Sequence, residues 1–160
     1  RRIDLTDPAS VLQYLNARFP MEQHGGLFFT MWYGVYRSDD RSLRYASAGH
    51  HPAFVVDAAR TGAVALEGSG LMIGAMAGAP YAVQQTTLPE GASVYLFSDG
   101  AFEIDTVDAG MWRLENLAPY LHAPSSPGVA EAERLYQVVM NASASRTLAD
   151  DFSMLVLTFD

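Results

Sequence analysis

The chain has 160 residues, of which 49% are hydrophobic and 18% are charged, and its formal net charge is −8. This composition is that of a globular domain and not of a disordered chain. No apolar run approaches the ~20 residues that cross a bilayer, so no membrane segment is predicted. The absence of cysteine excludes disulfides and thiolate metal sites and agrees with a reducing, cytoplasmic compartment. The acidic balance disfavours nucleic acid as a partner and suits hard cations.

The first third of the chain predicts a helix and a hairpin. Thr6-Asp7-Pro8 is typical of a helix start, and the apolar residues that follow favour a helix over 8–19. The run "GGLFFTMWYGVYR" (25–37) is apolar on both alternating faces, which predicts a central strand covered on both sides. "SDDRS" is a turn and "LRYASAGH" a returning strand, so we expect the two strands to form a hairpin.

Short strands continue through the middle of the chain. "AFVVD" (53–57) is a third strand that turns through "AARTG" toward "AVAL". Four glycines between residues 68 and 79 predict a flexible or tightly turning loop. "YAVQQTTL" and "SVYLFS" are expected to pair with each other across Pro89-Glu90-Gly91.

Two helices and a last strand complete the prediction. "MWRLENLAPYLH" (111–122) is expected to be a helix with an internal Pro119, and "PGVAEAERLYQVVMNAS" (127–143) a second helix. The apolar stripe of this second helix is predicted to be Val129, Ala132, Tyr136 and Val139. "DDFSMLVLTFD" (150–160) reads as a strand that is apolar on both faces. Hairpin-linked strands with segregated helices predict a single α+β domain over 1–160, with two stacked antiparallel sheets and outer helices.

Aspartates stand at complementary ends of two predicted strands. Asp99 follows the strand "SVYLFS", and Asp150-Asp151 precedes the last strand. If these strands are central antiparallel neighbours, the two ends share one edge of the sheet and the carboxylates meet there. Aspartate oxygens without cysteine or a histidine cluster are the ligand set of Mg²⁺ or Mn²⁺. Aspartate and glycine are also ordinary turn residues, so a purely structural role for Asp99 stays open at this point.

The other candidate residues give weaker evidence for a functional site. His50-His51 is a tandem whose rings point to opposite faces of an extended chain, so we expect hydrogen bonds before Pro52 and no joint metal site. The glycines of residues 68–79 do not open a helix after a strand, as a phosphate-binding loop requires. Ser98 has no neighbouring histidine for a catalytic triad. Glu103 either supports a site at Asp99 or faces solvent. The remaining candidates are expected to be packing aromatics: Trp32, Tyr33 and Trp112.

Four blocks of the sequence resemble the metal-dependent protein phosphatase family in their order. They are "LRYASAGHHPAFVV", "GLMIGAM", "SVYLFSDGAFEI" and "ADDFSMLVLTF", and they are most similar to the bacterial RsbU/SpoIIE branch, which is related to protein phosphatase 2C. The resemblance runs from about residue 11 to the end of the chain. It implies a β-sandwich flanked by helices, in the α-β-β-α arrangement, with two Mn²⁺ or Mg²⁺ ions at one end.

The resemblance also implies a site and a reaction. By motif, Asp99 of "SDG" and Asp150 of "DDFS" resemble catalytic, metal-ligating aspartates, with Gly100 and Asp151 as further members of the metal site. In such a site the metals activate a water that attacks the phosphorus of phosphoserine or phosphothreonine in line, without a phosphoenzyme. The implied substrate is a STAS-type anti-sigma factor antagonist, and the implied setting is bacterial signal transduction below an upstream sensor or receiver domain.

One part of the family pattern is missing from the sequence. The family places a further metal-binding aspartate in a "DxxGHG"-type block before the helix predicted at 8–19, and no such block occurs here. We therefore expect the C-terminal part of a domain, inactive by itself. Its unpaired strand edges would be covered by another chain, as in a homodimer, by strand exchange, or by residues outside this sequence. The alternative is a non-catalytic phosphatase-fold module that binds or sequesters a signalling partner.

Overall fold

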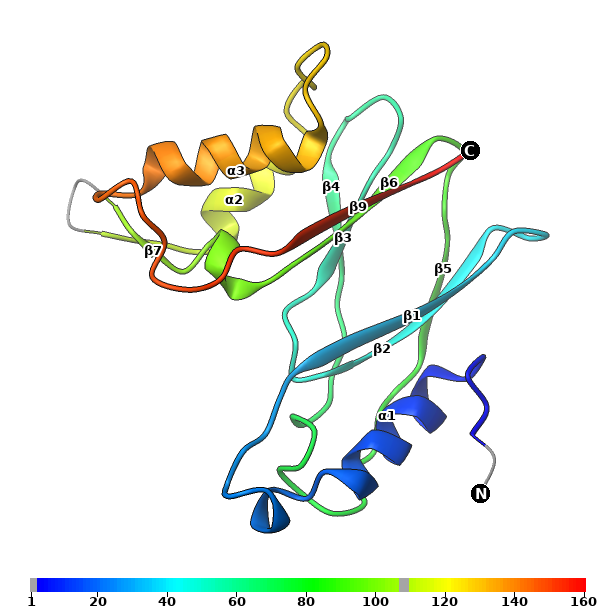
Figure 1. Cartoon of the computed structure of the whole chain (residues 1–160). Helices are drawn as coiled ribbons and strands as arrows, with labels where there is room; N and C mark the ends of the chain where they lie inside the picture. The colour runs from blue at the N-terminus through cyan, green and yellow to red at the C-terminus, as the bar shows by residue number, and fades with distance from the viewer. Residues whose placement is uncertain (1–2, 107–109) are drawn as a thin grey trace. The chain divides into compact units, whose positions relative to one another are not determined.

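The computed structural model describes residues 3–106 and 110–160. The chain forms two compact units, one of Arg1–Pro52 with Leu66–Leu88 and the other of Ala53–Ala65 with Pro89–Asp160. Each unit combines an antiparallel sheet with helices (Figure 1). The fold is therefore α+β, as the sequence predicts. A single domain over residues 1–160 stays a prediction, because each unit is compact by itself.

The sheet of the first unit has the order β1-β2-β5, with β1 at Met31–Arg37, β2 at Ser42–Ala48 and β5 at Gln84–Thr87. The predicted hairpin is confirmed, since β1 and β2 are antiparallel neighbours. The predicted central place of the aromatic strand is wrong, because β1 pairs only with β2 among the described residues. The apolar residues on its second face pack within the sheet itself: the ring of Trp32 stacks on Tyr45 with centroids 5.3 Å apart.

Helix α1 (Pro8–Arg18) lies where the sequence predicts a helix, and the short 3-10 helix η1 (Met21–Gln23) follows it. The Asp7 carboxylate caps α1 by accepting hydrogen bonds from the Ser10 amide at 3.2 Å and from the Ser10 hydroxyl at 2.7 Å. Leu12 is fully buried in a cluster with Ala46 and Ala48 of β2. The apolar stripe of α1 therefore covers one face of this sheet.

The sheet of the second unit has the order β4-β3-β6-β9. Its strands are β3 (Ala53–Val56), β4 (Ala63–Leu66), β6 (Ala92–Phe97) and β9 (Met154–Phe159). The predicted pairing of "YAVQQTTL" with "SVYLFS" is wrong, because β5 pairs with β2 in the other sheet, whereas β6 lies between β3 and β9. Their side chains explain the separation: β5 is polar and largely exposed, and β6 is apolar and largely buried.

A small hairpin and two helices follow β6. The hairpin pairs β7 (Ile104–Asp105) with β8 (Met111–Trp112), so the first predicted helix begins later than expected, as α2 (Leu114–Leu121). The second is α3 (Glu131–Ala142), which begins after Val129. The predicted stripe is therefore correct only in part: Val139 is buried with Leu135, whereas Val129 is 44% exposed.

The core of the second unit lies between the sheet and these two helices (Figure 1). It is built from apolar side chains of alternate strand positions and from the inner faces of the helices: Phe54, Val56, Tyr95, Phe97, Leu117, Leu121, Leu135 and Val139. Trp112 belongs to the same cluster, as expected for a packing aromatic. Each fully buried side chain of this size contributes about 1.5–3 kcal/mol to folding.

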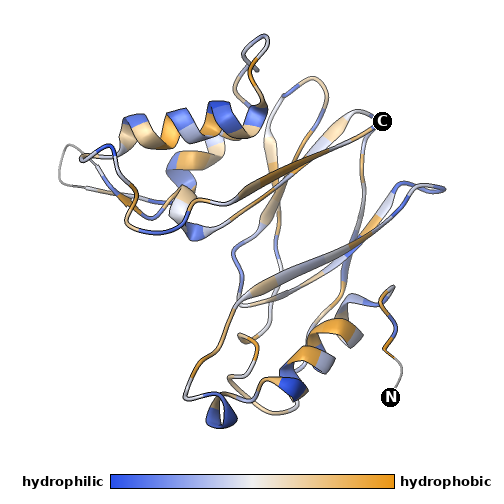
Figure 2. Ribbon diagram, viewed as in Figure 1, coloured by the Kyte–Doolittle hydropathy of each residue, from blue (hydrophilic) through white to orange (hydrophobic). Residues whose placement is uncertain are grey.

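Strand β9 is apolar on both faces, as predicted, but only one face is covered in the described part of the chain. Met154 and Val156 pack against the core, whereas Leu155 is 52% exposed and Leu157 is 41% exposed. Figure 2 shows hydrophobic colouring along β9. Within residues 3–106 and 110–160, β9 pairs only with β6, so it is an edge strand and not a central one. The sequence predicts such an edge, with no second strand beside it in the described part of the chain.

Candidate active site

Strand β6 ends in a tight turn that carries Asp99. This turn is a 3-10 helix, η2 (Asp99–Ala101), in which the Asp99 carbonyl oxygen accepts from the amides of Phe102 and Glu103, both at 2.8 Å. The Gly100 amide donates to Asp99 Oδ1 at 3.0 Å. Gly100 is buried, while Asp99 and Glu103 are exposed. The turn thus holds its backbone inside and leaves the Asp99 carboxylate accessible, and Glu103 is the solvent-facing residue that the sequence left open.

The second acidic turn leads into β9. Asp150 Oδ1 accepts a hydrogen bond of 2.7 Å from the Asp151 amide, and both side chains are exposed. Phe152 follows at once and packs edge-on against Tyr136 of α3, with ring centroids 5.2 Å apart. This aromatic contact fixes the chain directly after the two aspartates and so holds the C-terminal end of their turn in place.

The two turns meet at one edge of the sheet. The β6–β9 ladder is antiparallel and ends at the pair Phe97–Met154, beyond which the Ser98 amide donates to the Ser153 carbonyl at 2.9 Å. The hydroxyl of Ser98 accepts from the Ser153 amide at 2.9 Å and donates to the Asp151 carbonyl at 2.7 Å. The predicted antiparallel pairing is confirmed, and it brings the Asp99 turn and the Asp150-Asp151 turn together.

The sequence suggests only one possible role for Ser98, that of a nucleophile. It does not predict that the Ser98 hydroxyl connects the two turns. No signal in the sequence assigns that link, because the bonds of a serine at a strand end depend on which strand lies beside it. Within the described ranges the Ser98 hydroxyl bonds to the backbone of Asp151 and Ser153, and the expectation that it belongs to no catalytic triad stays a prediction.

The donor chemistry of this edge fits a hard divalent cation in kind. Asp99 and Asp150 offer carboxylate oxygens, which are the ligands that Mg²⁺ and Mn²⁺ prefer. In each of them Oδ1 accepts from the amide of the next residue, and Oδ2 has no hydrogen bond within the described part of the chain. Across residues 3–106 and 110–160, no group of three or more His, Asp or Glu side chains could hold a metal ion. The edge therefore presents aspartate carboxylates of the right chemical kind, and their binding of a metal is proposed below.

His50 and His51 lie in the other unit and hydrogen-bond to the backbone, as predicted. Nδ1 of His50 is 2.8 Å from the His51 carbonyl oxygen, and Nδ1 of His51 is 3.2 Å from that of Pro52. The prediction that their rings point to opposite faces is wrong, since the ring centroids are 4.1 Å apart. Strand β2 ends at Ala48 and β3 begins at Ala53, so the tandem lies outside both strands and the alternation of a strand does not apply.

The glycine-rich segment 68–79 is the tightly turning loop that the sequence predicts. Asn16 of α1, only 3% exposed, donates to the Met76 carbonyl and accepts from the Gly74 amide, both at 2.8 Å. A Cβ on Gly74 would lie 2.4 Å from the Phe19 carbonyl oxygen, so only glycine fits there. Asn16 is not among the candidates predicted from the sequence, although a polar residue on the apolar stripe of a helix is a signal that the sequence contains. This cluster packs the loop onto α1 and offers no reactive group.

A polar cluster in the second unit is also structural. Glu131 Oε1 accepts from Arg60 Nη2 and Arg134 Nη2, both at 2.6 Å, and from the Tyr95 hydroxyl at 3.0 Å. Burial raises the pKa of Glu131, but hydrogen bonds from Arg134, Arg60 and Tyr95 outweigh this effect and lower it to about 2. Arg60 also donates to two backbone carbonyls at and beyond the end of α2. The cluster ties the β3–β4 turn to the two helices.

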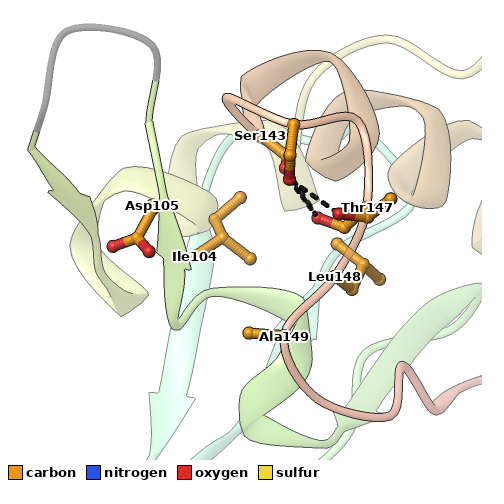
Figure 3. A pocket seen from close by; sticks show the side chains of 7 residues that line it. Ile104, Asp105, Ser143, Thr147, Leu148 and Ala149 are labelled. Atoms are coloured by element: carbon orange, nitrogen blue, oxygen red, sulfur yellow. Dashed lines mark hydrogen bonds between the residues drawn. The ribbon is translucent and has the colours of Figure 1, made fainter.

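Two small cavities are lined by residues that follow the Asp99 turn or precede the Asp150-Asp151 turn in sequence. The first is about 90 Å³ and is shown in Figure 3; its lining residues are Ile104, Asp105, Ser143, Ser145, Thr147, Leu148 and Ala149. The hydroxyl of Ser143 donates to the Thr147 carbonyl at 2.7 Å, which fixes the wall that leads into Asp150 (Figure 3). The second is about 200 Å³ and begins at Phe102 and Glu103, just after the Asp99 turn. Both linings adjoin the aspartate turns in sequence, and neither includes Asp99, Asp150 or Asp151.

The fold is that of a PP2C-like phosphatase domain, and comparison with known families agrees. Residues 3–160 match the family model of Stage II sporulation protein E (SpoIIE). The chain therefore belongs to the SpoIIE family, within the RsbU/SpoIIE branch of the metal-dependent protein phosphatases. The family resemblance seen in the sequence is confirmed.

Individual relatives support the same assignment. The chain is 29% identical over 151 residues to the phosphoserine phosphatase RsbU of Bacillus subtilis (strain 168), covering 94% of this chain and 44% of RsbU. It thus spans less than half the length of that relative. The SiaA-PP2C domain of Pseudomonas aeruginosa has a TM-score of 0.80 at 20% identity over 96% of this chain and 60% of its own. The phosphatase domain of SpoIIE from Bacillus subtilis, presoaked with Mn, has a TM-score of 0.60 at 18% identity over 82% and 56%. These structural matches show the fold.

Within the described ranges, no helix combines the length and the apolar character that a membrane crossing needs.

Proposed function

We propose that this chain belongs to a Mn²⁺- or Mg²⁺-dependent phosphatase that hydrolyses phosphoserine or phosphothreonine on a protein. The observation that carries the proposal is the meeting of the Asp99 turn with the Asp150-Asp151 turn at the end of the β6–β9 ladder. Membership of the SpoIIE family and similarity to a phosphoserine phosphatase support it. Asp99 and Asp150 are proposed as metal ligands, with Asp151 and Gly100 as supporting members of the site.

The proposed roles follow from the positions of these residues. Bound divalent ions would supply an activated water and neutralise charge on the phosphoryl oxygens. Asp99 and Asp150 each have one carboxylate oxygen held by a backbone amide, which orients the other oxygen for a cation. Gly100 lets the two turns approach, and Asp151 contributes its carbonyl to the link between them.

The proposed substrate is a phosphorylated regulatory protein of the STAS type, an anti-sigma factor antagonist. RsbU, the relative named above, is a phosphoserine phosphatase, which supports phosphoserine as the group that is hydrolysed. We further propose a cytoplasmic signalling protein in which a sensor or receiver domain controls the phosphatase. Such a protein would take part in stress-related sigma factor regulation.

This chain by itself is proposed to have little or no activity. The described residues provide no cluster of three metal-binding side chains, and two carboxylates are a weak site for two cations. Two metal ions would require at least one further carboxylate from outside the described residues. Activity would then appear in the full-length protein and be lost in residues 1–160 alone.

The test is Mn²⁺-dependent hydrolysis of p-nitrophenyl phosphate by the full-length protein and its variants. Asp99→Asn and Asp150→Asn should each lower the rate at least a hundredfold, and EDTA should abolish it. The matched control is Asp39→Asn, which removes one carboxylate from an exposed ion pair on the β1–β2 turn and should leave the rate unchanged. Unchanged activity in Asp99→Asn would refute the assignment of that residue.

The second candidate function is a non-catalytic phosphatase-fold module that binds or sequesters a signalling partner. The incomplete ligand set of the described residues favours it. The two functions differ in the full-length protein: an Asp-x-x-Gly-His-Gly block and Mn²⁺-dependent turnover mark the enzyme. A protein that binds its partner equally well with and without Asp99, and never turns over, would be the module.

A further inference from the structure

Ser98 is the residue through which the two aspartate turns are hydrogen-bonded to each other. Its hydroxyl uses both of its functions, accepting from the Ser153 amide at 2.9 Å and donating to the Asp151 carbonyl at 2.7 Å. Asp99 is its covalent neighbour on one side of this link. On the other side, the Asp151 peptide donates through its amide to Asp150 Oδ1 at 2.7 Å.

These bonds form one continuous path between the two candidate ligands. It runs from Asp99 through the Ser98 hydroxyl to the Asp151 carbonyl, and then through the Asp151 amide to the Asp150 carboxylate. Beyond Phe97–Met154 the Ser98 amide still donates to the Ser153 carbonyl, but the Ser153 amide donates to the Ser98 hydroxyl, which takes the place of a backbone acceptor. Three hydrogen bonds of Ser98 reach the segment 151–153, and two of them use the side chain.

We propose that Ser98 is a positioning residue that sets the separation and orientation of Asp99 and Asp150 for metal binding. This inference rests on the proposed function, because it assigns Ser98 to the same site. Groups that orient metal ligands without touching the metal typically change its affinity about 10- to 100-fold when they are removed. The turns are exposed, so water can satisfy the freed Ser153 amide and Asp151 carbonyl, and folding should be affected much less than affinity.

The chain offers a matched control for this test. Ser153 takes part in the same contact only through its backbone amide and carbonyl. Ser153→Ala therefore deletes an identical hydroxyl at the same place and leaves every bond of the link intact. Ser98→Thr keeps the hydroxyl and should rescue the function that Ser98→Ala loses.

The experiment titrates the full-length protein with Mn²⁺ alone and follows the EPR signal of free Mn²⁺. Ser98→Ala should bind Mn²⁺ about tenfold more weakly or worse, while Ser98→Thr and Ser153→Ala stay within about twofold of the wild type. Equal affinity of Ser98→Ala and wild type would overturn the inference. So would an equal loss in Ser98→Ala and Ser153→Ala.

A second measurement separates this inference from the proposed function. Amide hydrogen exchange of the metal-free protein should be faster at Asp151 and Ser153 in Ser98→Ala, and unchanged at Asp151 in Ser153→Ala. If the wild type binds no Mn²⁺, the proposed function fails. In that case unchanged exchange in Ser98→Ala would also overturn the link, whereas faster exchange would support it.

Discussion

Gly100 lies against the backbone of Asp151 so closely that a Cβ on Gly100 would stand 2.5 Å from the Asp151 carbonyl oxygen. A methyl group there would push the η2 turn away from the Asp150-Asp151 turn, because neither backbone has space to retreat without breaking hydrogen bonds. We expect Gly100→Ala to lower the free energy of unfolding by about 1–3 kcal/mol. Urea denaturation followed by circular dichroism would measure it.

Gly62 provides the control for this substitution. It belongs to the same unit, and no atom lies within 4 Å of the Cβ that alanine would add. Gly62→Ala should leave the free energy of unfolding unchanged or raise it by up to about 1 kcal/mol, through a less flexible unfolded chain. Equal destabilisation by both variants would show that the contact with Asp151 is not the cause.

The carboxylate of Glu131 should make stability depend on pH in the acid range. Its pKa is lowered to about 2 in the folded chain from an ordinary value of 4.5. A lowered folded pKa means that the contribution is fully present above pH 4.5 and is lost as the pH falls from there toward 2. Glu131→Gln should remove at most about 3 kcal/mol of this pH-dependent stability. Denaturation curves between pH 7 and pH 2.5 would measure it.

Glu133 is the control on the same helix. It is exposed, and its carboxylate accepts only from Gln137 at 2.8 Å among the described residues. Glu133→Gln should change the free energy of unfolding by less than about 0.5 kcal/mol and should keep the loss of stability in acid. If Glu131→Gln shows the same acid loss as the wild type, another group is responsible for it.

Asn16 should be more important to the first unit than its polar character suggests. Its buried side chain satisfies both the Met76 carbonyl and the Gly74 amide. Asn16→Leu keeps much of the volume but leaves both groups without this partner, so we expect a loss of about 2–4 kcal/mol. Gln13→Ala, at an exposed position of the same helix, should cost less than about 0.5 kcal/mol. A loss in Asn16→Leu no larger than in Gln13→Ala would contradict the prediction.

The exposed leucines of β9 should make the isolated chain self-associate. Leu155 and Leu157 form an apolar face on a strand edge without charge, proline or bulge to protect it. Leu157→Lys should lower the apparent mass in light scattering at high protein concentration and reduce the binding of a hydrophobic dye. Ala59→Lys adds the same charge on the exposed β3–β4 turn and should change neither. Equal effects of both lysines would point to net charge instead of the β9 face.

The sequence predicted most elements of this fold because their signals are local. The cap at Asp7 and the proline at Pro8 start a helix whatever surrounds them, and the apolar run 94–97 forms a strand that must be buried. The aspartates were found for the same reason, since each stands at the end of an apolar strand. The order of the motifs indicated the protein family, and the match over residues 3–160 confirms it.

The tertiary structure alone decided which segments became neighbours. β5 and β6 are close in sequence but lie in different sheets, and β9 lies at an edge although its composition suits a central strand. The closeness of Gly100 to Asp151 and the bonds of Ser98 depend on the register of β6 against β9. Such contacts join residues some fifty positions apart, and their free energy depends on side chains of both partners at once. A pattern along one segment carries no information about the segment that it pairs with. Local patterns therefore identify the aspartates as candidates, whereas only the fold brings them together.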